Sequence, residues 1–191
     1  MESNSSEYRS DVFRDPDSDT RDGFLDLLSE EVLQEIQHGL LDGRFRIIKY
    51  IGAGGMGVVF QVQDILTNES KALKFIRKNL ANKSEFKQRF LREVKLCQKI
   101  TSPNVINVHD VRQYKGSLYY VMEYLQGVSL RAMIQDRAKR GVMISLKEIH
   151  HIFSEICAGL AAVHEITVHR DLKPENVFLQ ANKKVTILDF G

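Results

Sequence analysis

The chain of 191 residues is long enough for one domain with a sizeable core or for two small lobes. Its hydrophobic content of 43% and charged content of 27% are typical of a soluble globular protein, and no apolar run is long enough to span a membrane. The net charge of +2 gives no indication of a nucleic-acid partner, and we expect none. The two cysteines, Cys97 and Cys157, fall at apolar positions of predicted helices, so we expect buried thiols and a cytoplasmic protein.

Charge is distributed unevenly along the chain. Residues 1–43 hold twelve Asp or Glu and three Arg, a balance of −9, whereas residues 44–191 have a balance of +11. The acidic stretch is poor in apolar residues over its first half, so we assign residues 1–28 to a disordered tail. The basic domain that follows suits a phosphate-bearing ligand, although lysines on a solvated face explain its charge equally well.

Residues 29–43 are expected to form a short helix and a linker. Ser29 is a suitable N-cap, and Asp42-Gly43 is a suitable end. The apolar stripe of this helix consists of Val32, Leu33, Ile36 and Leu40. It either packs on the following domain, which is the simpler interpretation, or binds a protein partner together with the acidic tail.

Residues 52–57 read Gly-Ala-Gly-Gly-Met-Gly and lie between two predicted strands. Four glycines in six residues allow backbone N–H groups to close over phosphate oxygens. The same spacing occurs in dinucleotide-binding turns, but such a turn opens a helix. Here residues 44–51 before the turn and 58–63 after it favour strands, because β-branched and aromatic side chains follow the glycines.

A third strand, residues 71–76, carries Lys74, and the next helix offers it an acidic partner. The apolar stripe of that helix contains Phe86, Phe90, Val94 and Cys97. Glu93 lies seven residues after Phe86, hence within about 20° of the same direction. Because a carboxylate inside an apolar stripe is costly unless it is paired, we predict that Glu93 pairs with Lys74.

Turn and capping signals predict the remaining elements. Strands are expected at residues 105–111 and 117–123 around a turn at 112–116, and helices at 129–137 and 145–164. Two helix starts have capping-box spacing: Asn82 with Glu85, and Ser145 with Glu148. The apolar stripe of the last helix consists of Ile149, Ile152, Phe153, Ile156, Leu160 and Val163.

The last twenty-three residues hold the densest set of polar side chains. They read His169-Arg170-Asp171-Leu172-Lys173-Pro174-Glu175-Asn176 and end in Asp189-Phe190-Gly191. A predicted hairpin of residues 177–179 and 185–188 brings Asn176 and Asp189 to the same end, where their oxygens suit Mg²⁺. Asp171 lies on the loop before the hairpin, placed to accept a proton rather than to bind metal.

These segments resemble the motifs of protein kinases: the glycine-rich loop, V-A-I-K, H-R-D-x-x-x-x-N and D-F-G. The third strand departs from the pattern, with Lys71 in place of the usual Val. The glycine loop and residues 120–125 are similar to bacterial serine/threonine kinases with eukaryotic-type domains, and Lys173 is typical of the serine/threonine class. The resemblance covers residues 44–191.

The resemblance implies an α+β protein-kinase-like fold. Its N-lobe, residues 44–122, would be complete, with a five-stranded antiparallel sheet and one helix. Residues 123–127 would form a hinge, and residues 128–191 the first part of a helical C-lobe. The implied cofactors are ATP and Mg²⁺, and the implied substrate is a protein Ser or Thr hydroxyl.

The resemblance also implies a role for individual residues. Asp171 would accept or orient the substrate proton, Lys173 would steady the γ-phosphate, and Lys74, held by Glu93, would grip the α- and β-phosphates. Asn176 and Asp189 would hold Mg²⁺. The nucleotide would further contact Ile51, Gly52, Ala53, Gly54, Gly55, Met56, Gly57, Val58, Val59, Ala72, Met122, Glu123, Leu125 and, beneath the adenine, Phe178.

In the kinase pattern, D-F-G is followed by an activation segment and an A-P-E motif, which would lie beyond Gly191. We therefore expect a truncated domain, either a fragment of a longer product or a natural truncation, which alone binds ATP weakly and does not transfer phosphate. Two hypotheses remain: an ATP-dependent serine/threonine protein kinase represented by this part, or a non-catalytic module that binds nucleotide or a partner. The coding sequence after Gly191 would discriminate between them.

Overall fold

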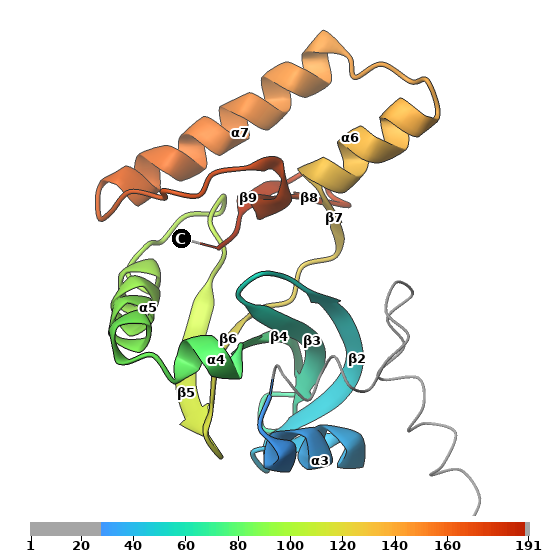
Figure 1. Ribbon diagram of the computed structural model, residues 1–191. Helices are drawn as coiled ribbons and strands as arrows, with labels where there is room; N and C mark the ends of the chain where they lie inside the picture. Colours follow the sequence, from blue (N-terminus) through green and yellow to red (C-terminus); the bar gives the residue numbers. More distant parts are fainter. Residues whose placement is uncertain (1–27, 190–191) are drawn as a thin grey trace, which may run out of the picture. The chain divides into compact units, whose positions relative to one another are not determined.

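The computed structural model describes residues 28–189, which divide into two compact units (Figure 1). The first unit comprises the chain up to Leu91 together with His109–Tyr124, and the second comprises Arg92–Val108 and the chain from Leu125. The predicted tail, apart from Leu28, and the Phe190-Gly191 end of the D-F-G motif lie outside the described residues. Leu28 is 1% exposed and belongs to the core, so its assignment to a disordered tail is wrong.

The first unit is built on a six-stranded sheet whose order is β1-β2-β3-β4-β6-β5. The strands are β1 (Leu40–Leu41), β2 (Phe45–Ala53), β3 (Gly57–Asp64), β4 (Glu69–Ile76), β5 (Val108–Tyr114) and β6 (Ser117–Glu123). Side chains of β3 alternate between buried and half-buried, as the period-two pattern predicts. Five strands were expected; the sixth is β1, which pairs antiparallel with the start of β2.

One face of this sheet carries an aromatic core. The rings of Phe45, Phe60, Phe75 and Tyr119 are fully buried, and they meet edge-on or tilted with centroids 5.2–6.3 Å apart. Such contacts add to the stabilisation from the buried area itself. These rings join side chains from strands β2, β3, β4 and β6 into one core.

Helix α3 (Glu30–His38) completes this core and ends earlier than predicted. Gly39 adopts the left-handed conformation (φ 80°) and caps the helix, so Leu40 enters β1 and is 40% exposed, whereas Leu41 is buried. Ser29 stands at the N-cap, but its hydroxyl lies 3.2 Å from the Ser117 hydroxyl and makes no cap bond.

The apolar stripe of α3 is buried in the core of the first unit. Val32, Leu33 and Ile36 are at most 6% exposed and join the aromatic core. Packing is thus the correct interpretation of this stripe, and the apolar face is not available to a partner.

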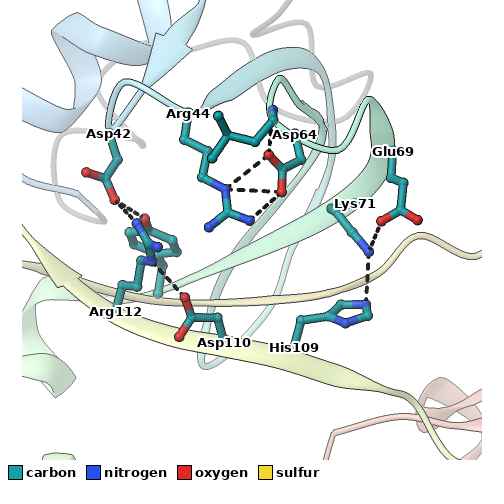
Figure 2. A network of polar contacts seen from close by, with 10 residues as sticks. Asp42, Arg44, Asp64, Glu69, Lys71, His109, Asp110 and Arg112 are labelled. Atoms are coloured by element: carbon teal, nitrogen blue, oxygen red, sulfur yellow. Dashed lines mark hydrogen bonds and ion pairs between the residues drawn. The ribbon is translucent and has the colours of Figure 1, made fainter.

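Polar contacts attach the α3–β1 segment to β5 and β6. The Asp42 carboxylate accepts hydrogen bonds from Arg112 (2.9 Å) and from the Tyr119 hydroxyl (2.7 Å), and Arg112 also binds Asp110 (Figure 2). Burial and the neighbouring carboxylate raise the pKa of Tyr119 above its usual value. Glu35 accepts from the Tyr114 hydroxyl at 2.8 Å.

Two local predictions for the first unit are wrong in detail. Strand β5 extends to Tyr114, and the turn into β6 needs only Lys115 and Gly116, both with positive φ, because such a turn matches the twist of the strands. A short helix, α4 (Lys78–Ala81), precedes α5 (Ser84–Cys97). Asn82 is the C-cap of α4, so it does not form a capping box for α5.

The second unit consists of α6 (Leu130–Lys139), α7 (Leu146–His164), the 3₁₀ turn η1 (Pro174–Asn176) and a three-stranded sheet. The sheet order is β7 (Gly127–Ser129), β8 (Val177–Gln180) and β9 (Val185–Ile187). The predicted hairpin is thus confirmed, with β7 as an unpredicted third strand. The Ser145–Glu148 capping box of α7 is also confirmed.

Helix α7 packs one side against the β8–β9 hairpin. Ile152 and Ile156 cluster there with Val177, Val185 and Ile187. Phe153, predicted to share that stripe, is 61% exposed. Cys157 is exposed as well, so the expectation of a buried thiol holds for Cys97 and fails for Cys157.

Gly57, which pairs with Ile76 in the β3–β4 register, lies very close to the neighbouring strand. A Cβ at this position would lie 1.7 Å from the carbonyl oxygen of Phe75. Glycine is therefore required by the neighbouring strand. Gly52, by contrast, has open space around the Cβ position.

We expect Tyr119→Phe to lower the free energy of unfolding by about 1.5–3 kcal/mol, because a buried hydrogen bond to the Asp42 carboxylate is lost. Urea unfolding measures this change. Tyr124→Phe is the matched control, since its hydroxyl takes no part in the network, and should change stability by less than about 0.5 kcal/mol. Equal effects of the two substitutions would contradict the role given to Asp42.

Gly57→Ala should destabilise the protein by about 1–3 kcal/mol, because the new methyl group must push β3 away from the Phe75 carbonyl. Gly52→Ala should be neutral or stabilise by up to about 1 kcal/mol, since it removes freedom from the unfolded chain without a clash. Thermal and urea unfolding of both variants test the contrast. A Gly57→Ala protein as stable as Gly52→Ala would show that the close approach is not a constraint.

Candidate active site

Four residues on neighbouring strands are paired in succession across the sheet of the first unit. Gly52 pairs with Val59, Val59 with Lys74, and Lys74 with Tyr120. Directly paired residues of antiparallel strands project to the same face, so Val59, Lys74 and Tyr120 share one face. The Lys74 ammonium lies 6.0 Å from the centre of the Tyr120 ring, and Lys74 is only 8% exposed. Lys74 is therefore a buried strand residue whose ammonium lies near Tyr120, and not a solvent-exposed surface lysine.

Two further predicted nucleotide contacts, Ala72 and Met122, lie on the same face. Ala72 pairs with Met122 two positions along the strands, in line with Lys74 and Tyr120. Ile51 is 46% exposed beside the glycine loop. Val58 does not belong to this set: it is fully buried in the aromatic core, because alternation along β3 turns it to the opposite face from Val59. Its side chain therefore does not face the same side as Lys74, and the contact of Val58 with nucleotide stays a prediction.

The glycine loop closes as a tight turn. Gly54 and Gly57 exchange backbone hydrogen bonds, at 2.8 Å and 3.3 Å. The open space around Gly52, Gly54 and Gly55 leaves their backbone accessible to a ligand. N–H groups in such a turn are suited to bind phosphate oxygens.

In the second unit, a strained turn presents Asp171. Its N–H donates to the His169 carbonyl at 2.8 Å, across Arg170, whose φ is 64°. Positive φ in a non-glycine residue costs about 1 kcal/mol or more and persists only where the surroundings hold it. His169 provides that support, since it is 2% exposed and its Nε2 donates to the Leu188 carbonyl at 2.9 Å.

The carboxylate of Asp171 receives two side-chain donors. Lys173 Nζ lies 2.6 Å and Asn176 Nδ2 3.1 Å from its Oδ2. The Lys173 ammonium holds the pKa of the Asp171 carboxyl below its usual value, and Asn176 adds to this effect. Asp171 is therefore ionised at neutral pH. A carboxylate of lowered pKa is a weak base, so Asp171 is better suited to accept a hydrogen bond than to remove a proton.

Asn176 connects this loop to the hairpin. Its Nδ2 also donates to the Asp171 carbonyl (2.9 Å), and its own carbonyl accepts from the Leu188 N–H (2.7 Å). Because Val177 pairs with Ile187, Asn176 and Asp189 lie at the same end of the hairpin, as predicted. These bonds use the amide nitrogen of Asn176 and leave its Oδ1 for a cation.

This donor set fits Mg²⁺. Mg²⁺ is commonly held by one or two protein oxygens together with substrate phosphates and water, and Asn176 Oδ1 and the Asp189 carboxylate are such oxygens. Within residues 28–189, no group of three or more His, Cys, Asp and Glu side chains is arranged to bind a metal ion. The fit is thus to a metal that arrives with a phosphate ligand, not to a complete protein cage.

For the remaining predicted site residues, the structure gives a position but not the predicted contact. Phe178 lies on β8 between Val177 and Leu179, hence on the opposite face of the hairpin from α7. Glu93 is in the second unit, where its carboxylate lies 3.9 Å from the Arg170 guanidinium. The pairing of Glu93 with Lys74, which belongs to the first unit, stays a prediction. So does the contact of Leu125 with adenine.

Two supporting residues were missed by the sequence analysis. His169 is part of the quoted motif, but only its bond to Leu188 reveals it as a support for the loop. Asn104 is 6% exposed and donates to the Val185 carbonyl (2.9 Å) and to Glu155 of α7 (2.8 Å). A lone Asn in a loop carries no sequence signal for this role. Together they tie the hairpin to the rest of the second unit.

Comparison with known proteins agrees with this geometry. Residues 45–191 match the family model of the protein kinase domain. The serine/threonine-protein kinase PknD of Chlamydia trachomatis is 35% identical over 156 residues, which are 78% of this chain and 17% of PknD. The serine/threonine-protein kinase PrkC of Bacillus subtilis is 32% identical over 152 residues, 79% of this chain and 23% of PrkC.

A solved structure gives the same result. The kinase domain of Mycobacterium tuberculosis PknI superposes with a TM-score of 0.71 at 27% identity, covering 80% of this chain and 61% of that domain. The chain thus spans less than a quarter of PknD or PrkC and about three fifths of the PknI kinase domain. The family match over most of its length, on the residues whose geometry is described above, shows that the chain belongs to the protein kinase domain family.

Proposed function

We propose that this protein is an ATP-dependent serine/threonine protein kinase and that residues 45–191 form the nucleotide-binding and catalytic-loop part of its domain. The observation that carries the proposal is the joint at Asn176, which orients Asp171 through its amide nitrogen and lies beside Asp189 at the hairpin end. The proposed catalytic carboxylate and the proposed metal ligands therefore share one connection through Asn176. The names of the bacterial relatives support the serine/threonine class.

The reaction is the transfer of the γ-phosphoryl group of ATP to a protein hydroxyl, and it depends on positioning and charge neutralisation. The glycine loop covers the phosphates with backbone N–H groups, and Lys74 neutralises the α- and β-phosphate oxygens. Asp171 orients the attacking hydroxyl, and Lys173, 2.6 Å from it, contributes positive charge near the transferred group. Asn176 and Asp189 would hold Mg²⁺, which would supply electrostatic stabilisation of the phosphates.

The remaining parts of the proposal rest on the sequence. The substrate is a protein Ser or Thr, and the site of action is the cytoplasm, where ATP is supplied. Within residues 28–189, no helix is both long and apolar enough to cross a bilayer. A non-catalytic nucleotide-binding module is the competing function, and it predicts binding of Mg·ATP without phosphate transfer.

In the full-length protein, Asp171→Asn should lower kcat by about 10²–10⁴-fold and change the Kd of Mg·ATP little, because Asp171 acts on the hydroxyl. Asp189→Ala should weaken the Mg²⁺-dependent part of ATP binding. Radiometric transfer to a generic basic protein and titration calorimetry measure the two effects. Glu175→Gln, a charge removed from the same turn, is the control and should have near-normal activity. Binding of Mg·ATP with no transfer by the unmodified protein would instead favour the non-catalytic module.

Lys74 and Glu93 should behave as a coupled pair. Lys74→Ala and Glu93→Ala are each expected to weaken Mg·ATP binding, and the double variant should lose little more, with a coupling energy of about 0.5–3 kcal/mol. The matched control cycle uses Glu85→Ala, at an exposed glutamate of the same helix, in place of Glu93→Ala. The losses of Lys74→Ala and Glu85→Ala should be additive. Simple additivity for Lys74 and Glu93 would count against their pairing.

A further inference from the structure

Arg77 contacts the glycine loop from the end of β4, three residues after Lys74. Its guanidinium donates two hydrogen bonds to the Gly54 carbonyl, from Nε at 3.1 Å and from Nη2 at 2.9 Å. The same carbonyl accepts from the Gly57 N–H at 3.3 Å. The backbone N–H of Arg77 donates to the Met56 carbonyl at 3.0 Å. Arg77 thus holds two carbonyls of the loop, one through its side chain and one through its backbone.

The peptide group held by the guanidinium is the one that can rotate most easily. It joins Gly54 to Gly55, so neither flanking residue has a Cβ that would resist rotation. Nothing lies within 4 Å of the Cβ position of either glycine, so steric contact does not restrain them. The described peptide bonds are all trans, and in a trans peptide the C=O and N–H point in opposite directions. Fixing the Gly54 carbonyl therefore fixes the direction of the Gly55 N–H.

We propose that Arg77 is a positioning residue that sets the orientation of the Gly54–Gly55 peptide, so that the Gly55 N–H is presented to a nucleotide phosphate. The presentation to phosphate rests on the function proposed above, whereas the restraint on the peptide does not. In the absence of Arg77, the peptide samples the flipped orientation, which turns a carbonyl oxygen toward the phosphate and repels it. The role of Arg77 is thus exerted through the loop and not through direct contact with ATP.

The chemistry of the contact distinguishes this role from simple attraction of phosphate by positive charge. A guanidinium offers two donors in a planar fork to one carbonyl, whereas the ammonium of lysine has equal charge and no such fork. Arg77→Lys therefore keeps the charge and weakens the restraint, and Arg77→Met removes both. Lys78→Met is the matched control, because it removes a neighbouring exposed cation that takes no part in the loop contacts.

The experiment uses the full-length protein without nucleotide and with Mg·ATP. In the nucleotide-free protein, ¹⁵N relaxation should give a Gly55 order parameter of about 0.8 for the unmodified protein and Lys78→Met, and below about 0.6 for Arg77→Met. The Kd and KM of Mg·ATP should rise about tenfold in Arg77→Met and about threefold in Arg77→Lys, with kcat within about twofold. Thermal unfolding checks that all variants are folded.

An unchanged Gly55 order parameter in folded Arg77→Met overturns the proposal. An Arg77→Lys protein that equals the unmodified protein in both order parameter and Kd also overturns it, because charge alone would then explain the loss in Arg77→Met. Failure of the unmodified protein to bind Mg·ATP would instead refute the proposed function, and the order parameter would still decide whether Arg77 restrains the loop.

Discussion

The carbonyl oxygen of Phe75 occupies the space that a side chain at position 57 would need, and the organisation of the first unit depends on this contact. It allows β3 and β4 to pair without interruption from Gly57 to Asp64. That register places Val59 opposite Lys74, and it brings the residue after β4, Arg77, within reach of the loop carbonyls. The glycine-loop backbone and Lys74, which we propose bind phosphate, are therefore positioned by the same strand pair.

In the second unit, side-chain hydrogen bonds position the loop that carries Asp171. Asp171 lies on a turn in which the preceding residue, Arg170, has a left-handed backbone conformation. A short loop does not maintain this conformation by itself. His169 and Asn176 bind the turn to Leu188, the residue that precedes Asp189. A displacement of the hairpin end would thus move the carboxylate as well. In the proposed phosphoryl transfer, a misplacement of about 1 Å lowers the rate strongly, so this shared support would matter for rate.

The α3–β1 segment lies before the residues that match the kinase family, yet it belongs to the first unit in physical terms. Its leucines and isoleucine fill the core beside Phe45 and Tyr119, and Asp42 neutralises Arg112 at the sheet edge. Removing this segment would expose the buried aromatic face and take away one of the carboxylates that bind Arg112, which would keep its contact with Asp110. The first compact unit of this chain therefore includes residues that precede the family match.

Much of the site was determined by the sequence itself, because its information is local. The strand, glycine loop and second strand follow from residue types in the twenty consecutive positions 44–63, and a hairpin of the observed length must bring Asn176 and Asp189 to one end. Contacts between distant residues were decided only by the tertiary structure. The Arg77–Gly54 bond, the Asp42–Tyr119 bond and the support from Asn104 join residues 23, 77 and 81 positions apart. Periodicity reports which face of an element is apolar but not which element covers it, and for that reason the exposure of Phe153 and Cys157 and the burial of α3 emerged only from packing.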